Sequence, residues 1–265
     1  MSIWINDRPL DALVSAITGL DGYLAPDAPS RELVALADTA AIVGTSIQVA
    51  PRTITVTVDI ETSGLLDRQT MLDTVARHLR GRLRLRTADR PDREISVVCQ
   101  GTALAFYHQP LAVVACSLTL TFVAPDPVWT DREPLVLGLS GTRVPCPLGT
   151  ATVAPRLTLY GGTVVDPVVI VRAASGEEAG RLTLTGSLSS TGALVIDAAT
   201  QTLEHYVAGV LQTGATVGLA WLTSGTFPLL DPSDADATQS AWPTIELTAS
   251  SGTPTGVLTY ARRFS

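Results

Sequence analysis

The sequence predicts a mainly β protein composed of two domains. Three observations lead to this fold class: segments of alternating apolar and polar residues recur along the chain, only one segment has helical periodicity, and a stop falls near mid-chain. The stop is Pro125-Asp126-Pro127. Two prolines so close together cannot continue a sheet ladder, because proline lacks the backbone N–H. Trp129 follows and is expected to anchor the junction of the two domains, with Asp126 forming a turn.

The first domain, residues 1–135, should contain strands and one helix. Residues 54–61 alternate Ile and Val with Thr and Asp, which is the pattern of a half-buried strand. Within 66–80, apolar residues recur three and four positions apart, which predicts a helix that Asp67 caps and Gly81 ends. These elements predict a β-sandwich or barrel with the helix packed on one side. Further strands are expected at 82–87, at 94–101 and in the long run that ends at Phe122.

The second domain, residues 136–265, shows no helical period. Its short apolar segments are separated by turn residues at intervals of about eight to twelve positions, which is typical of an all-β sandwich or jelly roll. The acidic, Ser-rich segment 229–242 is the one long loop. The expected strands lie at 155–161, 167–173, 180–188, 192–198, 202–208, 215–222, 243–249 and 256–264.

Composition limits the classes of partner. Charged residues make up only 16% of the chain, so small polar residues or other subunits must cover much of the surface. The net charge of −7 gives the molecule as a whole no attraction for nucleic acid. No apolar run is long enough for a membrane span, and the N-terminal residues lack the pattern of a signal peptide. We therefore expect synthesis and folding in a cytoplasm.

No catalytic residue, metal site or cofactor site is predicted. The histidines are scattered, without the spacings typical of zinc sites. Aspartates at predicted strand ends could form a glycosidase pair, but such residues more often form turns by bonding to nearby backbone amides. Because nucleophile and phosphate-loop motifs are also absent, a non-enzymatic role is favoured. The scattered histidines are His78, His108 and His205, and the aspartates at predicted strand ends are Asp59, Asp126, Asp166 and Asp197.

The strongest charge cluster lies on the predicted strand 82–87. Its period of two places Arg82, Arg84 and Arg86 on one face, opposite two leucines. These arginines are candidates for a subunit or ring interface that meets the carboxylates of a neighbour. A solvated strand face and a contact with DNA phosphates are the alternatives. No aromatic residues alternate with the arginines, which argues against recognition of single-stranded nucleic acid by stacking.

The order of several segments carries a resemblance to a known family. These segments are PRTITVTVDIE, LDRQTMLDTVARHLRGRLRL, CSLTLTFVAPDPVWT, TATVAPRLTLYGGTVVDPVVIV, GSLSSTGALVIDAAT and GVLTYARRFS. They resemble, in sequence order, strands and turns of the distal tail (Dit) proteins of long-tailed, siphovirus-type bacteriophages. The similarity covers about residues 50–265, and the order and spacing of the motifs carry it. The acidic loop departs from the pattern, because many members have a short turn there.

The resemblance implies a tail-tube-like first domain with a packed helix and a galectin-like β-sandwich as the second domain. It also implies a homo-hexameric ring that joins the tail tube protein to tail-tip and other tail-associated proteins. DNA would pass through the ring channel without specific binding, and the second domain would hold receptor-binding proteins or baseplate parts. The protein would be assembled in the host cytoplasm and reside at the tail tip of the virion, with neither enzyme activity nor a cofactor.

Two alternative functions are compatible with the sequence. A carbohydrate-binding two-domain β protein acting in host adsorption would need an aromatic groove, which the dispersed tryptophans do not predict. A tail tube protein would not need the second domain. The oligomeric state separates the first alternative from the hub, because a glycan-binding protein of this kind is expected to be monomeric.

Overall fold

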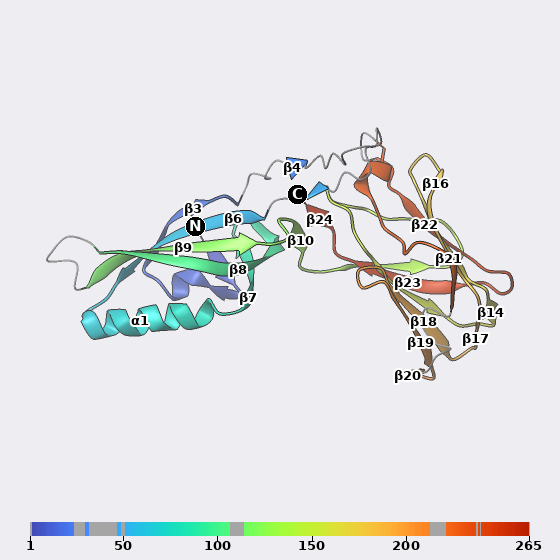
Figure 1. The fold of residues 1–265 in the computed structure, drawn as a ribbon, viewed down its shortest axis with the longest axis horizontal. Helices are drawn as coiled ribbons and strands as arrows, with labels where there is room; N and C mark the ends of the chain where they lie inside the picture. The colour runs from blue at the N-terminus through green and yellow to red at the C-terminus, as the bar shows by residue number, and fades with distance from the viewer. Residues whose placement is uncertain are drawn as a thin grey trace, which may run out of the picture. The chain divides into compact units, whose positions relative to one another are not determined.

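The computed structural model describes residues 2–23, 30–31, 47–48, 51–106, 114–212, 221–236, 238 and 240–264. Antiparallel strands dominate these ranges, and α1 (Leu65–His78) is the α-helix found in them (Figure 1). The predicted mainly β fold with one helix is therefore confirmed. No helix in the described ranges is both long and apolar enough to cross a membrane.

Contacts between residues divide the chain into two units. The first ends at Trp129 and the second comprises Thr130–Phe264. The division precedes the boundary expected near residue 135, because Leu135–Leu139 forms β11 of the second unit. β11 pairs residue by residue with β23 (Thr255–Tyr260), so these residues already belong to the second unit's sheet.

One antiparallel sheet forms the first unit, with the strand order β2-β1-β7-β8-β9-β6-β3. Its spine is the ladder between β6 (Arg52–Glu61) and β9 (Ala115–Ala124), which are in register along their whole length. β8 (Arg90–Phe106) pairs with β7 through its first half and with β9 through its second half. The strands predicted in this half of the chain are therefore confirmed. The remaining strands are β1 (Ile3–Ile5), β2 (Arg8–Pro9), β3 (Ala16–Asp21), β7 (Arg82–Thr87) and the separate pair β4 (Ser30–Arg31) and β5 (Ile47–Gln48).

Alternation along the spine separates a core face from an outer face. Ile54, Val56, Val58 and Ile60 of β6 are fully buried, as is Phe122 of β9. The side chains between them point to the opposite face, because successive residues of a strand alternate. Burial of each such side chain contributes about 1.5–3 kcal/mol. The spine therefore supplies much of the first unit's core.

Helix α1 confirms the predicted helix but not its predicted cap. Gly64 occupies the N-cap position with extended backbone and no side-chain cap bond. Asp67 lies inside the first turn, where its carboxylate accepts a hydrogen bond from the Ser63 hydroxyl and complements the helix dipole. The helix ends at His78. Gly81 follows with a φ of 79°, which reverses the chain into β7 without the steric cost that a side chain would bring.

The second unit is a sandwich of two antiparallel sheets, as the sequence predicts. Their strand orders are β11-β23-β13-β18-β19-β20 and β12-β22-β15-β16-β21. The strands not yet bounded are β12 (Val144–Pro145), β13 (Arg156–Tyr160), β15 (Val168–Arg172), β16 (Glu178–Leu184), β18 (Gly192–Asp197), β19 (Thr202–Val207), β20 (Val210–Leu211), β21 (Leu222–Gly225) and β22 (Thr244–Thr248). A separate short pair is β14 (Val164–Val165) with β17 (Ser187–Leu188). β10 (Trp129–Asp131) pairs with β24 (Arg263–Phe264), and both are strands of the nine-stranded sheet, not of the two sandwich sheets.

The sandwich core lies between the inner faces of these two sheets. Leu157 and Leu194 from one sheet and Val169 and Leu247 from the other belong to a single buried cluster. Most of the strand predicted at 215–222 lies outside the described residues. Within its described residues, the acidic segment predicted as a loop contains a short 3-10 turn, Pro232–Asp234.

The Phe122→Ala substitution should destabilise the first unit by about 3–5 kcal/mol, because it leaves a cavity in the core of the spine. Hydrogen exchange read strand by strand checks this. β6, β8 and β9 should lose protection, whereas β13 and β18 should keep theirs because their core is a separate cluster. Thr121→Ala, which changes a partly exposed neighbour, is the matched control. Equal loss of protection in both units would contradict the separation of the two cores.

Candidate functional site

The arginine row on β7 has the alternation that the sequence predicts. Leu83 and Leu85 are fully buried, whereas the arginine between them, Arg84, has 59% of its side chain exposed. The row, defined as Arg82, Arg84 and Arg86, therefore occupies the outer face of the sheet. Arg82 and Arg84 are exposed there, whereas the Arg86 side chain is only 16% exposed.

Arg82 Nε donates to Ser96 Oγ over 2.9 Å, whereas the ion pairs of the other two arginines of the row are loose. Arg84 lies 3.9 Å from an Asp7 carboxylate oxygen and 3.5 Å from one of Glu94, and Arg86 lies 3.9 Å from the other oxygen of Asp7. Arg86 also stacks over the Trp4 ring, 4.7 Å from its centroid. These ion-pair distances exceed hydrogen-bond length, so the pairs are weak and exchangeable.

A second outer-face feature is a surface of small hydroxyl side chains on the spine. Thr55 pairs with Thr121, and Thr57 pairs with Thr119. In β8 the residues opposite are glycine and alanine, Gly101 and Ala103. We call the surface formed by Thr53, Thr55, Thr57, Ser117, Thr119 and Thr121 the threonine face. Charged side chains border it: Asp21 of β3 lies opposite Thr55, and Asp59 and Glu61 follow at the end of β6.

The predicted junction residues occupy different environments. Asp126 is exposed, Pro127 is buried, and Trp129 is completely buried at the start of β10. Sequence reasoning missed the neighbouring pair Asp131 and Arg262. Arg262 Nε donates to Asp131 Oδ2 over 2.6 Å, and Asp131 N donates to the Arg262 carbonyl over 3.0 Å. This pair joins the first and last segments of the second unit, which lie too far apart in sequence for a local pattern to indicate.

The aspartates considered for catalysis include clear turn formers. Asp166 Oδ1 accepts from Gly186 N over 2.9 Å, and Asp197 Oδ1 accepts from the backbone N–H groups of Ala199 and Thr200. The acidic loop is organised in the same way, because Asp231 Oδ1 accepts from Ser233 N at the start of the 3-10 turn. Asp197 and Asp231 thus serve their own turns, whereas Asp166 joins segments that lie 20 residues apart in the sequence.

The histidines do not converge. His78 lies beside Arg8, His205 packs against Trp221 with ring centroids 5.1 Å apart, and His108 lies outside the described residues. Among the residues that the structure describes, no group of three or more histidine, cysteine or acidic side chains could hold a metal ion.

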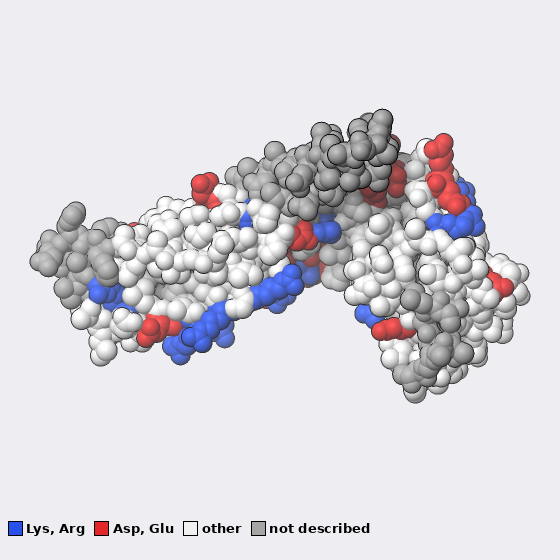
Figure 2. All heavy atoms as spheres, viewed as in Figure 1, with Lys and Arg blue, Asp and Glu red and all other residues white. Residues whose placement is uncertain are grey.

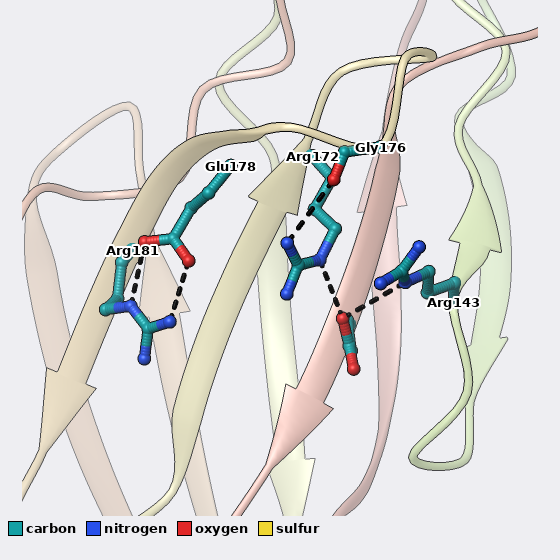
Figure 3. A network of polar contacts seen from close by, with 6 residues as sticks. Arg143, Arg172, Gly176, Glu178 and Arg181 are labelled. Carbon is teal, nitrogen blue, oxygen red and sulfur yellow. Dashed lines mark hydrogen bonds and ion pairs between the residues drawn. The ribbon is translucent and has the colours of Figure 1, made fainter.

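A cluster of charged residues on the second unit was not predicted. Arg143 precedes β12 and Arg172 ends β15. In Figure 3 both point at one carboxylate, and their hydrogen bonds identify it as that of Glu246 on β22. Arg172 Nε donates to Glu246 Oε2 over 2.9 Å, and Arg143 Nε donates to the same oxygen over 3.3 Å. We call these three residues the arginine–glutamate cluster. On β16 the neighbouring pair Glu178 and Arg181 is bidentate, at 2.8 and 2.7 Å.

The two arginines change the acidity of Glu246. The hydrogen bond from Arg172 is the main cause that holds the pKa of Glu246 below its usual value, and the bond from Arg143 adds to it. The ionised carboxylate is therefore the form that the fold favours. Elsewhere charge is sparse: most of the described surface visible in Figure 2 belongs to uncharged residues.

Comparison with solved structures gives the fold of the whole chain. The crystal structure of the Dit protein of phage SPP1, described there as a paradigm of the hub adsorption apparatus in phages that infect Gram-positive bacteria, aligns with a TM-score of 0.73. The alignment covers 100% of this chain and 99% of that chain, at 13% sequence identity. The chain has the Dit fold. The resemblance read from the sequence is therefore confirmed at the level of fold.

Other comparisons are more distant. Two structures of the phage p2 baseplate in its activated conformation, with Ca and with Sr, align with TM-scores of 0.37 and 0.41 at 8% identity. They cover 87% and 91% of this chain, and 86% and 89% of the matched chains. No family model matches the sequence. No curated protein matches it either.

The Glu246→Gln substitution should lower the free energy of unfolding at neutral pH by ~1 kcal/mol, because it removes the charge that both arginines face. The pKa of Glu246 is lowered in the folded state from an ordinary value of 4.5, so its stabilisation is present above that pH. This stabilisation is lost as the pH falls through the lowered pKa that Glu246 has in the folded protein. The difference between wild type and variant in denaturant unfolding should therefore vanish in acid.

Glu178→Gln is the matched control for this measurement. It removes a carboxylate from an exposed pair on the same sheet, where little stabilisation is expected. A difference between wild type and Glu246→Gln that stays constant from neutral to acidic pH would contradict the assignment to ionised Glu246.

Proposed function

We propose that the chain is a structural protein of a bacteriophage tail, the distal tail hub. Six copies would form a ring that joins the tail tube protein to the tail tip or baseplate and leaves a channel for DNA. The observation that carries this proposal is the likeness to the SPP1 Dit protein over the whole of both chains. Because both units match in one alignment, the likeness extends beyond a common β-sandwich.

The surface of the first unit supports assembly by burial against neighbours. Large apolar side chains are exposed on helix α1, where Leu65 and Leu66 are 58% and 78% accessible, and on β8, where Val98 and Leu104 are 42% and 41% accessible. A ring uses heterologous contacts, in which two different faces of each subunit meet. Exposed apolar residues on two separate elements, together with a charge content of only 16%, suit such contacts.

We place the threonine face toward the channel. A duplex slides most freely along a lining without cations, because each phosphate contact made by Arg or Lys adds affinity. The arginine row lies on the same face of the sheet, with Arg82 in register with Thr53 through β8 and β9, so this placement requires a neighbouring subunit to cover the row. The threonine face offers short hydroxyl groups, with alanine and glycine of β8 beside it and carboxylates at one margin. Such a lining conducts DNA without binding it specifically.

The arginine row is the proposed subunit or ring interface. Its weak internal pairs with Asp7 and Glu94 can be exchanged for carboxylates of a neighbouring copy or of a stacked ring at small cost. The second unit, a galectin-like sandwich in this proposal, would hold tail-tip or receptor-binding proteins. The junction at Asp126, Pro127 and Trp129 would connect ring and periphery. The hub acts by assembly in the host cytoplasm and in the virion tail tip, with neither catalysis nor a cofactor.

Reversing the charge of Arg82, Arg84 and Arg86 to Glu should abolish ring formation, because three carboxylates would then face those of the neighbour. Light scattering coupled to size exclusion measures this. The wild type should have six or twelve times the 27.8 kDa subunit mass and the variant should be monomeric. Reversal of Arg132, Arg156 and Arg181, which are exposed on the second unit, changes the net charge equally and is the control. A variant that stays hexameric with normal exchange protection in β8 would contradict the interface.

One observation favours glycan binding as a second function. Tyr160 and Tyr206 share the outer face of the larger sandwich sheet, in register on either side of Ala193. The Tyr206 hydroxyl donates to Glu204 Oε2 over 2.9 Å, on the same strand. This bond directs the tyrosine ring along the strand, so a ring face is available for stacking on a sugar. The two tyrosines lie ~10 Å apart, two strand spacings.

A glycan array tests this second function. If the pair of tyrosines forms a sugar platform, wild-type protein should bind a defined subset of glycans, and Tyr206→Ala and Tyr160→Ala should each lose that subset. Val136→Ala, which shortens an exposed side chain on β11 at the other end of the same sheet, serves as the control. An empty array, or a binding pattern that both alanine variants retain, would remove the observation's support for glycan binding.

A further inference from the structure

The arginine–glutamate cluster carries one positive charge more than it neutralises. Two guanidinium groups face a single carboxylate, and both donate to the same oxygen, Glu246 Oε2. A guanidinium has five N–H donors. Arg143 uses only its Nε, and Arg172 uses its Nε and one Nη group, which donates to the Gly176 carbonyl over 3.4 Å. Among the described residues the other Nη groups of the cluster have no partner.

The neighbouring pair shows what a closed ion pair looks like on the same sheet. Arg181 donates through Nε and Nη2 to the two oxygens of Glu178, in the bidentate geometry that satisfies both groups. The cluster instead engages its carboxylate from the side through Nε, which leaves Nη donors of both arginines for another acceptor. Arg143 also has 54% of its side chain exposed, against 20% for Arg172 and Glu246. The unused donors of Arg143 are therefore accessible.

The acidic residues around the cluster favour a single carboxylate over a long polyanion as its ligand. The turn that contains Gly176 is held against the acidic loop, because Ala174 N donates to the Asp234 carbonyl over 2.6 Å. With Glu178 across the sheet and a net charge of −7 for the chain, a long polyanion such as a nucleic acid meets repulsion on several sides. A single carboxylate, in contrast, is small enough to contact the cluster alone, whose two arginines and one glutamate leave one positive charge in excess. Planar guanidinium donors match a carboxylate in two-point geometry.

We propose that the arginine–glutamate cluster is a docking site for one carboxylate, an Asp or Glu side chain or a chain terminus, of a partner tail protein. This inference rests on the proposed function, since it assigns a partner chemistry to the peripheral unit of the hub. Arg143 is the exposed half of the fork, and Glu246 positions both guanidinium groups by holding their Nε atoms. Docking here would complement the ring contacts of the first unit.

The test is a titration followed by the Nε–H signals of arginine in ¹⁵N NMR spectra. The probe is an acetylated and amidated pentapeptide with one central glutamate between glycines, and the control peptide has glutamine in its place. The glutamate peptide should shift the Arg143 and Arg172 signals saturably, and the glutamine peptide should not. Because the protein is acidic overall, general attraction cannot produce saturable binding of an acidic peptide.

Arg143→Gln should weaken the peptide at least tenfold, whereas Arg181→Gln, which alters the closed pair, should leave affinity unchanged. Absence of saturable shifts, or equal affinity in Arg143→Gln, would overturn the site. Inorganic phosphate that binds more tightly than the peptide and loses affinity in Arg143→Gln would overturn the protein-carboxylate assignment. Light scattering on the same samples distinguishes failure of the docking site from failure of the hub proposal. Rings that do not bind the peptide would contradict only the docking site. Peptide binding by a protein that forms no rings would contradict only the hub proposal.

Discussion

The ladder between β6 and β9 is the constraint on which the first unit depends. Every residue of β6 has a partner in β9, from Arg52 opposite Ala124 to Glu61 opposite Ala115. A slip of one residue would turn threonines into the core and isoleucines and valines into solvent, so the apolar pattern fixes the register. The same register creates the outer threonine face. One pattern of side chains therefore determines both the stability of the unit and the chemistry of its exposed surface.

The second unit depends on a different set of contacts. Its two sheets enclose their own apolar cluster, and the pair Asp131–Arg262 joins the segment that enters the sandwich to the segment that leaves it. The side chain of Asp131 is only 6% exposed. A charge-assisted bond at such a site is worth more than one in open solvent, because fewer waters compete for it. The Asp131–Arg262 pair thus holds together the two segments that enter and leave the sandwich. The outer faces of its sheets can then contact partners.

Local patterns predicted much of the fold. Alternation identified β6, β7 and β9, helical spacing identified α1, and turn residues separated most strands of the sandwich, because these signals lie within single elements. The prediction that Asp67 caps helix α1 was wrong, because Gly64 takes the N-cap position. An extended backbone without a side-chain cap bond is enough to begin this helix. The arginine–glutamate cluster could not be predicted: Glu246 lies 74 residues from Arg172 and 103 from Arg143, and only the strand order brings them together.

We propose that copies of this chain close into a ring around an open channel. Electron microscopy of the purified wild-type protein, with class averages of end-on views, tests it most directly. The account predicts six-fold symmetric rings with an open centre, surrounded by six peripheral densities of sandwich size. Averages that show only single two-lobed particles, or closed assemblies without a central opening, would contradict it.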